Sequence, residues 1–182
     1  MVFTDSGKVF QTPVYEIPEG TRVAKGRGLL NFIELSSQDK VLSLFAFGKS
    51  AQGGGKDTVQ YLVMITKDGI IKKTPLEDFK NARKSGLIAM SLKKGDLLRS
   101  VQKSTGEDEL IITTRKGQSI HFREKDVRSM GRPAAGIHAI RLKKGPASTR
   151  VERGEDEVVG MDVISNPKSL PRRQAGEARN PK

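Results

Sequence analysis

Residues 61–92 read YLVMITKDGIIKKTPLEDFKNARKSGLIAMSL, and their pattern decides the fold class. Apolar, strand-like runs lie on both sides of the KDGI turn, and a third run, GLIAMSL, follows the basic segment KNARKS. Glycine tolerates the positive φ of a tight hairpin turn, so Gly69 indicates a β-hairpin. The stretch therefore predicts short strands joined by a hairpin, and a loop with three basic residues and no acid.

The same arrangement occurs three times along the chain. A turn glycine lies between two apolar runs in each unit, at Gly7, Gly69 and Gly117. A second glycine opens a third run: GLLNFIEL at 28–35, GLIAMSL at 86–92 and GIHAIRL at 136–142. A fourth run follows: KVLSLFAF at 40–47, DLLRSVQK at 96–103 and EVVGMDVI at 157–164. About four short strands at a period of roughly 50 residues predict an all-β, propeller-like fold, with a generic β-sandwich as the alternative.

The repeat divides the chain into one domain and a tail. We expect blades at about 1–47, 59–104 and 109–164, within a single domain at 1–164. The segment GKSAQGGGKD between the first two units is typical of a flexible linker. The third unit carries an insertion of about ten residues, which a surface turn can absorb. Residues 165–182 are basic, contain proline and have few apolar side chains, so we expect them to be disordered.

Composition limits the classes of function. Lys and Arg outnumber Asp and Glu by 33 to 21, and a net charge of +12 favours a polyanionic partner such as nucleic acid, an anionic membrane or an acidic protein. The absence of cysteine excludes disulfides, cysteine-based zinc sites and thiol catalysis. The few aromatic residues argue against a stacking platform for single strands. No apolar run is long enough to span a membrane, and the N-terminus lacks a signal peptide pattern, so we expect a cytoplasmic protein.

Positive charge gathers in one loop of each unit, just before the second glycine. These loops are PEGTRVAKGR at 18–27, KNARKS at 80–85 and RSMGRPAA at 128–135, while acidic residues cluster at 106–109 and 154–157. Equivalent loops of a repeat array fall on one face, so we expect a basic stripe that is free of competing acids and binds phosphates. Ordinary solvated surface is the alternative. The candidate phosphate-binding residues are Arg22, Lys25, Arg27, Lys80, Arg83, Lys84, Arg128 and Arg132.

Several of these segments occur together in one known family. KKTPL at 72–76, RKSG at 83–86, VRSMGR at 127–132 and GIHAIRLKKG at 136–145 resemble the C-terminal domain of the DNA gyrase A subunit. The related subunit of topoisomerase IV shares that fold. The resemblance covers about residues 1–164. It implies a β-pinwheel, a propeller relative with six four-stranded blades that exchange strands with their neighbours, of which this sequence holds about three.

The resemblance also implies a function. The family's basic perimeter binds duplex DNA without sequence specificity and wraps it. That wrapping supports ATP-dependent negative supercoiling by a bacterial, nucleoid-associated enzyme of two A and two B subunits. We therefore expect double-stranded DNA, the rest of the gyrase A subunit and the gyrase B subunit as partners. The QRRGGKG-like motif that marks gyrase is absent, which leaves topoisomerase IV open as an alternative.

Catalytic chemistry is not expected in this chain. The resemblance places the cleaving tyrosine on another domain, and ATP and Mg²⁺ elsewhere in the parent enzyme. We interpret Tyr15 and Tyr61 as packing residues, and no P-loop pattern occurs. His121 and His138 lie on predicted strands without a third ligand nearby, so we expect no metal or other cofactor.

Two other kinds of basic β-repeat module fit the same composition. A module that binds acidic proteins requires exposed apolar or aromatic hot spots, which this sequence largely lacks. A module that binds RNA would prefer structured RNA to duplex DNA. Both remain alternatives at the level of sequence.

Overall fold

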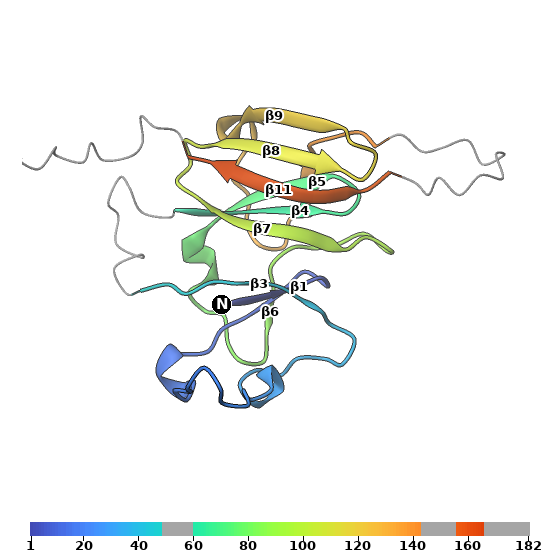
Figure 1. Ribbon diagram of the computed structural model, residues 1–182. Coiled ribbons are helices and arrows are strands. Elements are labelled where there is room, and N and C mark those ends of the chain that lie inside the picture. The colour runs from blue at the N-terminus through green and yellow to red at the C-terminus, as the bar shows by residue number, and fades with distance from the viewer. Residues whose placement is uncertain (49–59, 143–155, 166–182) are drawn as a thin grey trace, which may run out of the picture.

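The computed structural model describes residues 1–48, 60–142 and 156–165, which form three antiparallel β-sheets stacked on one another (Figure 1). We call them sheets A, B and C in chain order. Residues 49–59, which include most of the linker, residues 143–155, which include the insertion in the third unit, and the tail from 166 lie outside the described residues. Sheet A has the strand order β3-β1-β2-β6, formed by β1 (Val2–Thr4), β2 (Lys8–Phe10), β3 (Val41–Leu44) and β6 (Leu87–Ile88).

Sheets B and C follow the same plan. Sheet B has the order β10-β5-β4-β7, formed by β4 (Tyr61–Thr66), β5 (Ile70–Pro75), β7 (Leu98–Ser104) and β10 (Ile137–His138). Sheet C has three strands among the described residues, in the order β11-β8-β9: β8 (Glu109–Thr114), β9 (Ser119–Arg123) and β11 (Val158–Ile164). Short 3-10 helices connect the strands: η1 (Val14–Glu16), η2 (Leu29–Asn31), η4 (Leu76–Phe79) and η5 (Glu124–Asp126).

The turn glycines have the predicted role. Gly7, Gly69 and Gly117 have φ values of +77°, +83° and +78°, and they close the hairpins β1–β2, β4–β5 and β8–β9. Side chains with a Cβ rarely adopt this conformation, which explains the glycine at each turn. The repeat therefore follows from a backbone requirement at three equivalent positions.

In the second and third units, the third run does not stay in its own sheet. β6 comes from the second unit, yet it pairs with β2 of the first, with Leu87 opposite Val9. In the same way β10, from the third unit, pairs with β5 of the second, with Ile137 opposite Ile71. Each of these sheets is therefore completed by the following unit, as the family resemblance implies.

The first unit departs from this plan. The strand expected over residues 28–35 is absent, because Leu29–Asn31 form η2, whose N-cap is Gly28. Among the described residues, no strand pairs with this segment. Instead, Ile33 and the partly buried Leu29 and Leu35 pack on the outer face of sheet A. The prediction of a strand at residues 28–35 was wrong. A strand needs the edge of another strand to pair with, and the described residues offer none to this segment.

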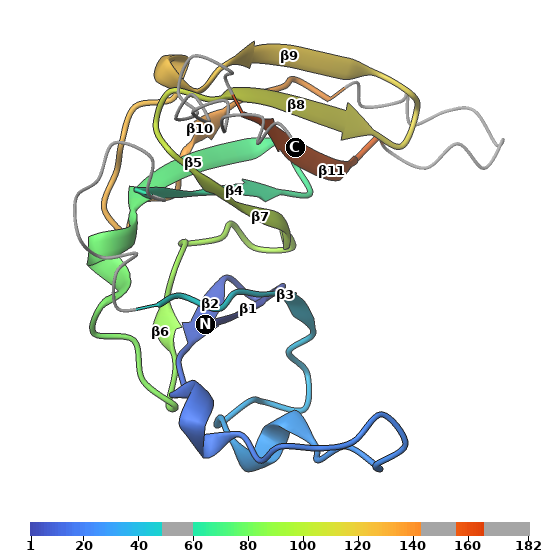
Figure 2. The same cartoon turned by 60° about the vertical axis from the view of Figure 1, so that its left-hand side comes forward.

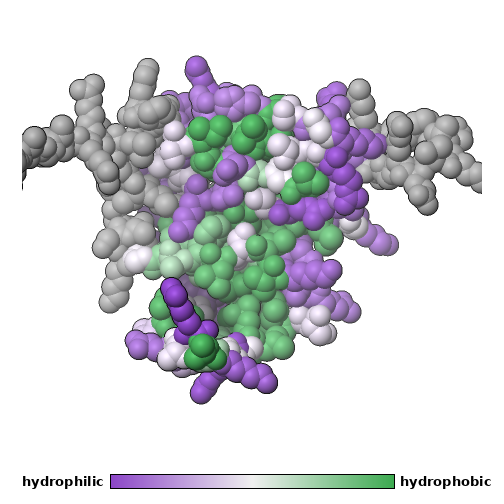
Figure 3. Space-filling view, in the orientation of Figure 1, coloured by the Kyte–Doolittle hydropathy of each residue, from purple (hydrophilic) through white to green (hydrophobic). Residues whose placement is uncertain are grey.

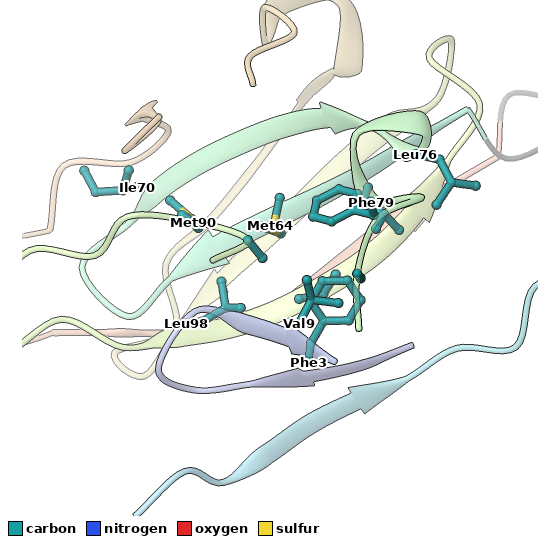
Figure 4. Close-up of a cluster of buried hydrophobic side chains, with 12 residues drawn as sticks. Phe3, Val9, Met64, Ile70, Leu76, Phe79, Met90 and Leu98 are labelled. Carbon is teal, nitrogen blue, oxygen red and sulfur yellow. The ribbon is translucent and has the colours of Figure 1, made fainter. Parts of the chain in front are cut away.

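The cores lie between successive sheets, and β4 serves both. Leu62 and Met64 belong to the core shared by sheets A and B, where Phe3 and Val9 approach them (Figure 4). Their neighbours Val63 and Ile65 point the other way, into the core shared by sheets B and C. Alternate residues of a strand face opposite sides of a sheet, so a strand buried on both faces is apolar throughout. This explains the continuous run YLVMIT.

Candidate nucleic-acid interface

Each unit leaves its sheet through a short 3-10 helix that follows its second strand. η1 follows β2, η4 follows β5 and η5 follows β9, and the three helices lie along one side of the stack (Figure 2). Proline stands at the N-cap of two of them, with φ values of −63° at Pro13 and −56° at Pro75. The basic segments come directly after these helices, so they leave the three sheets at equivalent points.

The second basic loop, 80–85, is held by the first unit. Ala82 is buried, which fixes the loop against the core. The carbonyl of Arg83 accepts a hydrogen bond from the backbone N–H of Gln11 at 3.2 Å. The carbonyl of Lys84 accepts another, from Glu34, at 2.9 Å. The loop backbone is therefore fixed, while all its basic side chains are exposed.

The third basic loop, 128–135, rests on the second unit. The backbone N–H of Met130 donates to the carbonyl of Lys73 at 2.8 Å. The hydroxyl of Ser91 donates to the carbonyl of Pro133 at 2.9 Å. Arg128 is exposed and Arg132 is half-buried. Each of these two loops is thus held by the preceding unit: the second loop by the first unit, and the third loop by the second unit.

A buried lysine strengthens this connection. Lys72 on β5 is fully buried, and its Nζ donates to the carbonyls of Ala89 at 2.6 Å, Arg132 at 2.5 Å and Gly131 at 3.3 Å. Burial lowers the pKa of Lys72 to about 8, with the positive charge of Arg132 acting in the same direction and Asp78 opposing it. Lys72 therefore links the second unit to the backbone of the third basic loop.

The first basic loop lies apart from the other two. Arg22, Lys25 and Arg27 are exposed, and the loop extends away from η1 along the lower part of the view (Figure 2). Within the loop, the backbone N–H of Ala24 donates to the carbonyl of Thr21 at 3.0 Å. The three loops thus share an origin on the sheets, and the second and third are each held by hydrogen bonds to the preceding unit.

The stripe is not free of acids, which corrects the sequence expectation. Lys80 lies 3.3 Å from the carboxylate of Glu77, and Lys84 forms an ion pair with Glu16 of η1. Both acids belong to the 3-10 helices that precede the loops, outside the segments compared in the sequence. Within the part of the chain that the structure describes, the other six candidates form no ion pair: Arg22, Lys25, Arg27, Arg83, Arg128 and Arg132.

Sequence reasoning gave no role to Lys72 or Lys73, which the structure shows to be buried. Lys73 donates to the carbonyl of Glu124 at 3.2 Å and lies 3.6 Å from its carboxylate. That carboxylate also accepts hydrogen bonds from the Ser104 hydroxyl at 2.7 Å and the backbone N–H of Gly106 at 3.1 Å. Two lysines inside a run that is otherwise apolar were the available signal, because a buried charge needs built-in partners.

The remaining residues singled out in the sequence have mixed outcomes. Tyr61 packs beside Gly106, and the Nζ of Lys73 lies 5.1 Å from its ring centroid. Tyr15 is 87% exposed, so its interpretation as a packing residue was wrong. His121 and His138 are exposed on β9 and β10, and His121 lies 2.9 Å from the carboxylate of Glu109.

The described ranges contain neither a metal-binding cluster nor a helix that could span a membrane. These residues include no group of three or more histidine, cysteine or acidic side chains placed to hold a metal ion. Every helix in the same ranges is too short or too polar to cross a membrane.

Comparison with known proteins agrees with the architecture. The family described as "DNA gyrase C-terminal domain, beta-propeller" matches residues 1–47, 60–104 and 108–165. Among curated proteins, the DNA gyrase A subunit of Haloquadratum walsbyi is 36% identical over 157 residues, which cover 86% of this chain and 18% of that protein. The DNA gyrase A subunit of Clostridium acetobutylicum is 42% identical over 137 residues, covering 75% of this chain and 16% of that protein. The chain thus spans less than a fifth of these relatives.

Solved structures agree with the fold. The crystal structure of the C-terminal domain of DNA topoisomerase IV matches with a TM-score of 0.74 and 25% identity, over 91% of this chain and 46% of that one. The DNA gyrase A C-terminal domain matches with a TM-score of 0.62 and 23% identity, over 88% of this chain and 45% of that one. With three stacked sheets, exchanged strands and a family match over most of its length, the chain belongs to the family of DNA gyrase A C-terminal domains.

Proposed function

We propose that this chain binds duplex DNA without sequence specificity, through its phosphates, and bends the duplex along the side of the stack that carries the basic loops. The observation that carries the proposal is that the second and third loops follow equivalent 3-10 helices on one side of the stack, and each is held by the unit that precedes its own. Arg83 and Arg128 are exposed there without ion pairs among the described residues, on backbones held by hydrogen bonds. Fixed backbones support binding because less freedom is lost when phosphates are contacted.

The chemistry requires only distributed positive charge. A Lys or Arg beside a phosphate releases a condensed counterion, and affinity accumulates over several contacts. Arginine adds paired hydrogen bonds to phosphate oxygens. Bending the duplex costs elastic energy, which contacts on several units of a curved surface can offset. The net charge of +12 supports such a surface.

In the whole enzyme, the domain would act beside the catalytic parts. We place it in a gyrase A subunit that works with gyrase B in the bacterial cytoplasm, at the nucleoid. There the bent DNA segment would support ATP-dependent negative supercoiling. ATP and Mg²⁺ would bind elsewhere in the enzyme, because the expected role of this domain is to hold DNA. The names of the curated relatives support this assignment.

Charge reversal tests the interface. The variant Arg27→Glu, Arg83→Glu, Arg128→Glu changes one exposed side chain in each loop. We expect its affinity for a duplex of about 40 base pairs to fall at least 100-fold at moderate salt, since three favourable phosphate contacts become repulsive. Six phosphate contacts from the unpaired candidates give an expected slope of about −5 for log K against log salt. Fluorescence anisotropy across a salt series measures both quantities.

A matched control lies at the opposite end of the sheets. Lys40, Lys93 and Lys94 are exposed and lie near the hairpin turns, where Lys40 bonds the backbone of Asp5 and Asp96 bonds that of Asp68. Reversing these three lysines changes the net charge equally, and we expect less than a fivefold loss of affinity. Equal losses in the two triple variants would show that binding depends on net charge alone. Tighter binding to structured RNA than to the duplex would contradict a duplex-binding surface.

A further inference from the structure

The third basic loop is held by two side chains of the second unit, Lys72 and Ser91. The Nζ of Lys72 donates to the carbonyls of Arg132 at 2.5 Å and Gly131 at 3.3 Å. The hydroxyl of Ser91 donates to the carbonyl of Pro133 at 2.9 Å. Three successive carbonyls of the loop therefore accept hydrogen bonds from side chains of one neighbouring unit.

Lys72 is itself fixed by the core. It lies on β5 opposite Met64 of β4, and its side chain is fully buried. Its third hydrogen bond, of 2.6 Å, goes to the carbonyl of Ala89. The N–H of the same Ala89 donates to the carbonyl of Gly7 in the first unit at 2.8 Å. An ammonium group has three donors, and all three are used here. The Nζ therefore connects the third loop to a segment that the first unit already holds.

The equivalent position in the first unit is occupied by a different kind of side chain. Lys72 comes three residues after the turn glycine Gly69, and Phe10 comes three residues after Gly7. The ring of Phe10 packs against Gly86, where an added Cβ would lie 2.5 Å from the ring. The second basic loop is thus held by an apolar contact and by backbone donors, whereas three carbonyls of the third loop accept from side-chain donors.

The length of the third loop explains why these anchors matter. It spans residues 128–135, whereas the second loop spans 80–85. Two backbone bonds add to the side-chain anchors: the N–H of Met130 donates to the carbonyl of Lys73 at 2.8 Å, and within the loop the N–H of Ala134 donates to Gly131 at 3.2 Å. A longer loop loses more conformational entropy when it becomes ordered. The side-chain anchors therefore help to decide whether the backbone beyond Met130 is fixed.

We propose that Lys72 and Ser91 are positioning residues for phosphate binding, which fix the backbone of the third loop so that its two arginines contact the duplex. This inference rests on the proposed function and deepens it. Lys72 is buried, so its contribution is to order the loop before DNA arrives. A loop that is already fixed loses less freedom on binding than one that must first be ordered. Arg128 and Arg132 form no ion pair among the described residues, which leaves both guanidinium groups available to phosphates.

Hydrogen exchange without DNA tests whether Lys72 orders the loop. Lys72→Met keeps a long side chain and removes all three donors. We expect the N–H of Ala134, which donates to Gly131 inside the third loop, to exchange at least tenfold faster in this variant. The N–H of Gly86, which donates to Arg83 at the end of the second loop, should exchange at an unchanged rate. Equal acceleration of both amides would show that the whole fold is destabilised, and would overturn the proposal.

Duplex binding tests whether that order matters for the phosphate contacts. With a duplex of about 40 base pairs, we expect Lys72→Met to weaken binding about tenfold and to make the salt slope less steep by about 1.8, which is two contacts at about 0.9 each. In the background Arg128→Gln, Arg132→Gln, the same change should alter the affinity less than twofold, because the contacts that Lys72 positions are already gone. A tenfold loss in both backgrounds, or an unchanged slope, would overturn this inference and leave the proposed function intact.

The control for the lost charge is Lys94→Met. Lys94 is exposed and comes shortly before Asp96, whose carboxylate accepts from the backbone N–H of Asp68 in a hairpin turn. The hairpin turns lie on the right-hand side of the stack in the view of Figure 1, and hydrophilic side chains gather along that edge (Figure 3). Lys94→Met therefore removes the same charge away from the third loop, and we expect it to change the affinity less than twofold.

A second variant, Ser91→Ala, keeps the test decisive if Lys72→Met does not fold. Ser91 is exposed, so its hydroxyl can be removed without a cavity in the core. We expect the N–H of Ala134 to exchange at least threefold faster, that of Gly86 to stay unchanged, and the duplex affinity to fall two- to threefold. An unchanged rate at Ala134 would overturn the proposal. A wild-type chain that does not bind the duplex would overturn the proposed function together with this inference.

Discussion

At the scale of the residue, the main result is that a strand of the second unit carries a charge into the core. Lys72 is fully buried, and three carbonyls surround its Nζ. The side chain therefore replaces water with backbone oxygens from two separate segments. An ammonium group surrounded in this way orders those segments, because each carbonyl is satisfied only while the others stay in place.

The lowered pKa of Lys72 predicts a pH dependence of stability. Burial lowers this pKa from 10.5 to about 8 in the folded chain, so between these pH values the unfolded chain binds a proton that the folded chain does not. Stability must then rise with pH across that window, by up to roughly 3 kcal/mol relative to a variant without the group. Urea unfolding of wild type and Lys72→Met at pH 7.5, 8.5 and 9.5 measures this difference.

The control for that experiment is Lys94→Met, at an exposed lysine. Its difference from wild type should stay constant from pH 7.5 to 9.5. A difference for Lys72→Met that also stays constant with pH would contradict the assignment of the shifted pKa to Lys72.

At the scale of the element, strand exchange explains why the backbone is crowded where an incoming strand joins the neighbouring sheet. β6 and β10 each contribute only two residues to a sheet, yet they close the edges of β2 and β5. Such short strands depend on close backbone approach. At Gly136 an added Cβ would lie 2.5 Å from the carbonyl of Ile71, so only glycine allows this approach.

Substitution of that glycine should release β10. Gly136→Ala combines a φ of +97° with the clash against Ile71, whereas Gly95→Ala has a φ of +86° and open space around it. We expect Gly95→Ala to cost about 1 kcal/mol of stability and Gly136→Ala at least about 3 kcal/mol. Hydrogen exchange of the Ala139 N–H, which donates to Gly69, should accelerate only in Gly136→Ala. Equal losses of stability in Gly136→Ala and Gly95→Ala would show that the positive φ, and not the clash with Ile71, causes the destabilisation.

At the scale of the whole molecule, the three sheets form one stack because the middle sheet is buried on both faces. Met64 packs toward sheet A, and its neighbour Ile65 packs toward sheet C. Contacts between β3 and β7 and between β7 and β11 add to this continuity. A repeat array in which each unit contacts only its neighbours is stabilised mainly by such shared cores.

The shared strand predicts cooperative unfolding. Met64→Ala and Ile65→Ala each create a cavity in a different core, and each should cost about 2–5 kcal/mol. Because both residues belong to β4, we expect a single urea transition in both variants, with coincident circular dichroism and tyrosine fluorescence curves. Two separated transitions in either variant would show that the cores unfold independently.

The candidate DNA-binding residues were named from the sequence, and the structure constrains how they can act. Exposure of the loops was predictable, since charged segments with glycine and proline lie on surfaces. The ion pair of Lys84 with Glu16 was not predictable, because the two residues belong to different units and meet only when the sheets are stacked. The same holds for the anchoring of the third loop to the second unit, which depends on a lysine inside β5.

The repeat, the hairpin turns and the all-β class could be predicted from the amino-acid sequence alone. These features are local: a glycine at positive φ and an apolar run of a given length need only their chain neighbours. Three features became evident only in the folded chain: which sheet each third run joins, the 3-10 helix at Leu29–Asn31, and the burial of two lysines. The physical reason is that pairing and burial depend on which edges and carbonyls a distant segment offers, and local sequence does not record that partner.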